Sequence, residues 1–99
     1  MTMDATTWVY VAIMKDGSSE QIVGQTDSEH DISFIPAFLN KESAQQAIFH
    51  LHLEKKKKYE VQAIIYEDLA RHAVENGFLI FILDEAGNVL ERLPAAPQA

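Results

Sequence analysis

Histidines and carboxylates are the side chains of this chain whose types and spacing could support chemistry. His30 lies in an acidic segment, close to Asp27, Glu29 and Asp31. Carboxylates at alternate positions are typical of the start of a calcium-binding loop. The rest of that pattern is missing, because Ile32 stands where the loop requires glycine and no bidentate glutamate follows at the required spacing. The segment is therefore predicted to be a solvated acidic loop without a native metal.

A second pattern pairs Asp68 with His72, four residues apart in a segment of helical periodicity. This spacing places both side chains on one helix face. A carboxylate beside an imidazole is the arrangement of an oriented general base, although the same pair is commonly an ordinary surface contact. His50 and His52 are two apart on a predicted helix, so they point about 200° apart and cannot share an ion.

No stretch of the sequence matches a nucleophile elbow or a phosphate-binding loop. The prediction is therefore that the protein is not an enzyme and uses no cofactor. The alternative is a small-ligand-binding or enzymatic domain built around His30, or around Asp68 and His72. That alternative requires a concave pocket containing a titrating group with a perturbed pKa.

Composition limits the classes of partner. The 99 residues include no cysteine, which excludes disulfides, thiol nucleophiles and thiolate metal sites and favours a cytoplasmic location. The net charge is −7, from 15 acidic and 8 basic side chains. A negative surface repels phosphate backbones, so no nucleic-acid partner is expected. The longest apolar run, at 78–83, is far shorter than the roughly 20 residues of a membrane-spanning helix, so no membrane association is expected.

The basic side chains are unevenly distributed. Lys55 to Lys58 form one run, and the remainder of the chain has 15 acidic against 4 basic side chains, a net charge of −11. The lysine run could attract anionic lipid or RNA, but it also suits a helix C-terminus and limits aggregation at a strand entrance. We interpret it as structural. The charge of the remainder supports an alternative function, an acidic inhibitor or immunity-type protein that masks a basic protein partner.

Periodicity and turn signals place these residues in a single α+β domain. Strands are predicted at 7–14, 20–25, 32–39, 59–66, 78–83 and 89–93. Helices are predicted at 41–54, after an N-cap at Asn40, and at 67–76, before Gly77. The predicted order is β-β-β-α-β-α-β-β, in a mixed or mostly antiparallel sheet with the two helices on one face. Residues 1–6 are predicted to be a flexible leader, 7–93 the domain and 94–99 a C-terminal tail.

The run from Phe78 to Leu83 is apolar at every position, so both of its faces need cover. Two short helices cover about one face of the sheet, and exposed apolar patches on the other face would mark an interface. The alternative is a sheet that coils on itself beneath the loop at 26–31. We expect a non-enzymatic protein-interaction or regulatory domain that forms a homodimer, or docks another protein, through the open face. The residues expected at this interface are Trp8, Tyr10, Phe49, Leu53, Tyr66 and Phe81.

Overall fold

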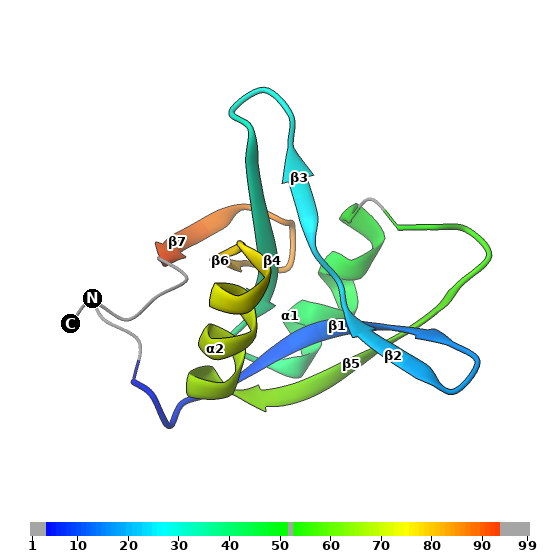
Figure 1. Ribbon diagram of the computed structural model, residues 1–99, viewed down its shortest axis with the longest axis horizontal. Coiled ribbons are helices and arrows are strands. Elements are labelled where there is room, and N and C mark those ends of the chain that lie inside the picture. The colour runs from blue at the N-terminus through cyan, green and yellow to red at the C-terminus, as the bar shows by residue number, and fades with distance from the viewer. Residues whose placement is uncertain (1–3, 52, 94–99) are drawn as a thin grey trace.

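The computed structural model describes residues 4–51 and 53–93 and places them in one seven-stranded mixed sheet with two α-helices (Figure 1). The predicted α+β class is confirmed. The strands are β1 (Trp8–Asp16), β2 (Ser19–Ile22), β3 (Gln25–Asp27), β4 (Ile32–Phe38), β5 (Lys58–Ile65), β6 (Leu79–Leu83) and β7 (Val89–Leu93). The helices are α1 (Lys41–Ala47), the 3₁₀ turn η1 (Ile48–His50) and α2 (Tyr66–Asn76). Sequence reasoning missed β3, which occupies the start of the predicted loop.

The sheet is organised around β1. One edge of β1 pairs antiparallel with the whole of β5. Its other edge pairs with β2 near the hairpin turn and with β4 at Tyr10 and Val11. β4 continues the sheet through a parallel pair with β6, which then pairs antiparallel with β7. Where β1 and β4 separate, β3 pairs with β4.

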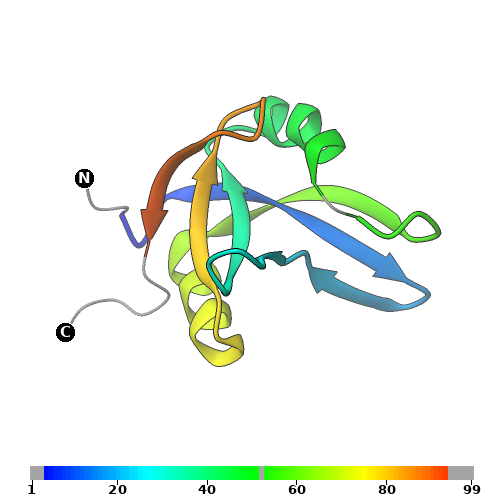
Figure 2. The same cartoon turned by 90° about the horizontal axis from the view of Figure 1, so that it is seen from above.

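The two helices lie on opposite faces of the sheet, which corrects the prediction that both cover one face (Figure 2). On β6, Ile80 and Ile82 pack in the cluster that contains residues of α2, whereas Phe81 and Leu83 pack with Ala44 and Ala47 of α1. We call these the α2 face and the α1 face. Both faces of β6 are therefore buried, as its sequence predicted.

Chain direction explains this arrangement. β4 and β5 are both antiparallel to β1, and β4 is parallel to β6, so α1 and α2 each connect parallel strands. The connection through α1 runs from β4 across β1 to β5. The connection through α2 runs back from β5 across β1 and β4 to β6. Such crossovers are almost always right-handed, and two right-handed crossovers that run in opposite directions lie on opposite faces.

Local signals set the start of α1 but not its end. The side chain of Asn40 accepts a hydrogen bond from the backbone N–H of Ser43 at 2.8 Å, as an N-cap does. α1 ends at Ala47, and the chain is extended again at Leu51, so the helix predicted to 54 is too long. Early termination lets Leu51 return to pack on the α1 face.

The start of α2 is capped by the segment before β1. The N–H groups of Tyr66 and Glu67 donate to the carbonyls of Thr7 and Ala5 at 2.8 and 3.0 Å. These contacts satisfy two of the amides that a helix leaves free at its first turn. Residues 4–6, predicted to belong to a flexible leader, are therefore part of the fold; residues 1–3 and the predicted tail at 94–99 lie outside the described residues.

Candidate functional site

The acidic loop, residues 27–31, connects β3 to β4 and projects beyond the rest of the sheet (Figure 1). Asp27 organises it, because its carboxylate accepts from the backbone N–H groups of Glu29 at 3.1 Å and His30 at 3.3 Å. The Nδ1 atom of His30 lies 2.9 Å from the other carboxylate oxygen of Asp27. This contact with the imidazole, followed by the backbone hydrogen bonds, lowers the pKa of Asp27 below its ordinary value.

Three side chains of this loop converge. One potential ligand atom from each of Asp27, Glu29 and His30 lies within 4.8 Å of the other two. Such a set has the donor atoms that a divalent cation uses. All three belong to one short, largely exposed turn, and the hydrogen bonds of Asp27 account for its shape. The geometry therefore agrees with the predicted solvated loop.

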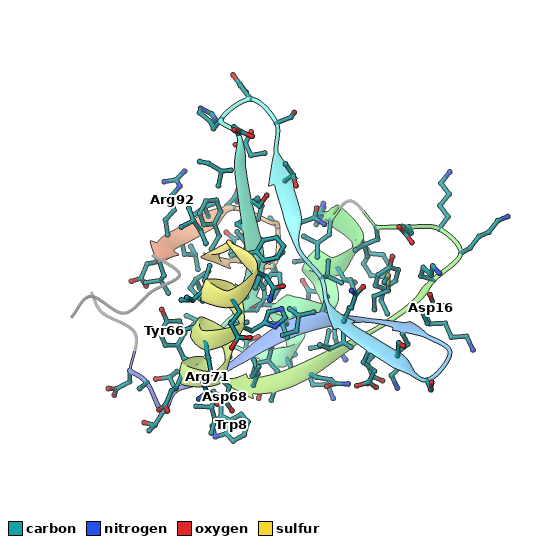
Figure 3. The ribbon with its side chains drawn as sticks, in the orientation of Figure 1. Trp8, Asp16, Tyr66, Asp68, Arg71 and Arg92 are labelled. Carbon is teal, nitrogen blue, oxygen red and sulfur yellow. The ribbon has the colours of Figure 1, made fainter. Side chains whose placement is uncertain are left out.

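The structure does not bring Asp68 and His72 together. Asp68 accepts a hydrogen bond from the guanidinium of Arg71 at 3.2 Å, and Arg71 also lies 3.8 Å from the carboxylate of Glu67 (Figure 3). These are exposed contacts between neighbouring turns of α2, worth a few tenths of a kcal/mol each. His50 is exposed in η1, and His52 lies outside the described residues.

Sequence reasoning missed a hollow of about 230 Å³ between the β1–β2 hairpin, the start of β5 and the chain after η1. The hydroxyl of Tyr59 closes one side, because it accepts from the N–H of Glu54 at 2.7 Å and donates to its carbonyl at 3.1 Å. That hydroxyl is thus already engaged, and among the described lining residues the titratable side chains are Glu54 and Tyr59. Its lining residues are Met14, Gln21, Ile22, Val23, Gly24, Leu53, Glu54 and Tyr59.

The six predicted interface residues differ widely in exposure. Phe49 is 87 % exposed in η1, and Trp8 is 56 % exposed at the start of β1. Tyr10, Leu53 and Tyr66 are half-buried, and Leu53 lines the hollow. Burial and the nearby carboxylate of Glu91 raise the pKa of Tyr66. The side chain of Phe81 is only 5 % exposed and lies in the core of the α1 face, so it offers no surface to a partner.

Part of the α1 face is less buried than the rest. α1 packs on β1, β5 and β4, and the residues at the starts of β4 and β6 are less buried than those that follow. On these strands Ile32, Phe34 and Leu79 are half-buried, and Phe34 stacks on Phe81 with 4.4 Å between ring centroids. The guanidinium of Arg92 lies 5.5 Å from the centroid of the Phe81 ring, a cation–π contact. We call Ile32, Phe34 and Leu79 the open patch, and Arg92 lies beside it on β7.

The lysine run makes a tertiary contact. The ammonium of Lys57 lies 2.9 Å from the carboxylate of Asp16, which joins the loop before β5 to the tip of the β1–β2 hairpin (Figure 3). Lys15, directly before Asp16 on β1, lies 3.1 Å from Glu60 and 3.6 Å from Glu20. This cross-strand network agrees with the structural interpretation of the run.

Comparisons with known proteins add no assignment. Neither the models of protein families, nor the curated proteins, nor the solved structures contain a match to this chain. In the described part of the chain, no helix is long and apolar enough to cross a membrane.

Proposed function

We propose that this protein is a non-enzymatic protein-interaction domain that associates with a second copy of itself through an apolar part of its sheet. The observation that carries the proposal is the open patch. Ile32, Phe34 and Leu79 lie on adjacent strands, and the sheet register places Phe34 directly beside Leu79. Their apolar surface is continuous with the buried cluster beneath α1. Burying such a surface against a partner is favourable by about 25 cal/mol for each Å² removed from water.

His30, Asp68 and His72 give the competing enzymatic function little support. Asp68 hydrogen-bonds to Arg71, so the proposed carboxylate–imidazole dyad is not formed. His30 sits on a projecting loop, away from the residues that line the hollow. A general base acts on a reacting atom that is held within hydrogen-bond reach, and a projecting turn does not position a substrate in this way.

Light scattering behind a sizing column tests the proposal. At tens of micromolar we expect a particle of about 22 kDa, twice the 11.1 kDa of the chain. Association through apolar surface persists at high salt, whereas a purely ionic contact is screened. A particle of 11.1 kDa across the whole concentration range would refute self-association.

A further inference from the structure

Opposite charges flank the open patch on the α1 face. Arg92 lies on β7 directly opposite Phe81, so the two side chains share this face. Among the described residues, no carboxylate pairs with Arg92 within ion-pair distance, and its guanidinium contacts the Phe81 ring instead. An exposed guanidinium without a carboxylate partner is available to an anionic group on another molecule.

The negative flank is the acidic loop, on the β3 side of the patch. Asp27 pairs with Ile32 across β3 and β4, so its side chain lies on the α1 face as well. The carboxylate of Glu29 lies within 4.8 Å of that of Asp27, so the two negative charges lie close together. The order across the sheet is therefore acidic loop on β3, apolar side chains on β4 and β6, and a cation on β7.

We propose that the open patch is the contact surface of a two-fold symmetric homodimer, in which Arg92 of each protomer faces the acidic loop of its partner. In a two-fold interface the same patch occurs on both sides and must be complementary to itself. A two-fold axis that lies in the plane of the interface, midway between two points, brings each point against the partner's copy of the other. An apolar centre with one charge sign on each flank satisfies that condition. This inference rests on the proposed function.

Charge favours a second copy over another occupant. A uniformly basic partner would be repelled by Arg92, and a phosphate backbone by the acidic loop. A stable interface buries about 800 Å² per partner, roughly an eighth of the 6587 Å² surface of this chain. Three half-buried side chains supply only part of that area. The projecting loop and the outer strand β7, where Leu90 is 59 % exposed, extend the contact.

Charge reversal with cross-rescue tests the arrangement. Arg92→Glu places like charges together at both symmetric contacts, and so does Glu29→Arg. We expect each variant alone to raise the dimer dissociation constant at least tenfold, by light scattering and sedimentation. An equimolar mixture of the two should recover dimers, because each contact then joins opposite charges. Glu29 suits this test because its exposed side chain makes none of the hydrogen bonds that shape the loop.

Three controls separate the possible outcomes. Arg92→Gln removes attraction without adding repulsion and should weaken the dimer less than Arg92→Glu. Glu75→Arg, exposed on α2, changes charge remote from the patch and should leave the dissociation constant unchanged. Circular dichroism checks that each variant is folded. If the wild type dimerises and both reversals leave its dissociation constant unchanged, this surface is wrong while self-association stands. If the wild type stays monomeric, both proposals fail.

Discussion

Gly24 lies between β2 and β3 against the ring of Phe78, and the space there excludes any larger residue. A Cβ atom added at Gly24 would lie 2.7 Å from Cε1 and 2.9 Å from Cζ of Phe78. Carbon atoms pack favourably at about 3.5 to 4.0 Å, so the ring or the strand must move by about 1 Å. Because Phe78 packs against the cluster beneath α2, its ring cannot move freely.

We therefore expect Gly24→Ala to destabilise the protein. Overpacking of this kind costs about 1–3 kcal/mol. Gly24 is not one of the glycines with positive φ, so alanine adds no left-handed strain. Replacing glycine also restricts the conformations of the unfolded chain, which raises the unfolding free energy by about 0.4–1 kcal/mol. The expected net loss is about 1–2 kcal/mol of unfolding free energy, measured by urea denaturation followed by far-UV circular dichroism.

A double-mutant cycle with Phe78→Leu isolates the steric cause. Leucine has no counterpart of Cε1 and Cζ, the two atoms that the new Cβ would meet. Gly24→Ala should therefore cost at least about 1 kcal/mol less in the Phe78→Leu background, a coupling typical of residues in contact. Gly17→Ala is the matched control, because Gly17 has φ +64° and no atom within 4 Å of an added Cβ. Its cost should be the same in both backgrounds. A stable Gly24→Ala variant, or zero coupling, would refute the packing argument.

Three further predictions concern a helix cap, the core and acid stability. Asn40→Ala removes the acceptor for the N–H of Ser43 and should lower the unfolding free energy by about 1 kcal/mol in urea titrations. Leu69→Ala opens a cavity at a fully buried site of α2 and should cost about 2–5 kcal/mol, whereas Val74→Ala, at a residue 47 % exposed on the same helix, should cost far less by the same assay. The N–H of Asn88 is the main cause that lowers the pKa of Asp84 below its ordinary value of 3.8. The ionised form is thus favoured in the folded state, so this stabilisation is present above pH 3.8 and is lost as the pH falls through the lowered pKa of the folded protein. The difference in urea midpoint between wild type and Asp84→Asn should be smaller below pH 3.8 than at neutral pH. A larger difference at acidic pH would contradict this assignment.

Local chemistry determined much of the element order. Asn40 caps α1, Gly77 ends α2 with φ +74°, and the apolar run at 78–83 became a strand with both faces buried. Each of these signals acts within a few residues, through a hydrogen bond, a backbone conformation or the alternation of side chains along a strand. The acidic loop was predicted as a solvated turn because it lacks the rest of a calcium-loop pattern, and in the structure the carboxylate of Asp27 accepts hydrogen bonds from its backbone.

Long-range packing decided the rest. The sequence by itself determined that the chain is a cysteine-free, acidic α+β domain and that the strand at 78–83 needs cover on both faces. Only the tertiary structure decided that α1 and α2 lie on opposite faces, because this depends on the directions in which two crossovers traverse the sheet. That arrangement buries Phe81 and leaves Phe34 and Leu79, near the starts of β4 and β6, only half-buried. It also places Arg92 and Asp27, 65 positions apart in the sequence, on the same face of one sheet.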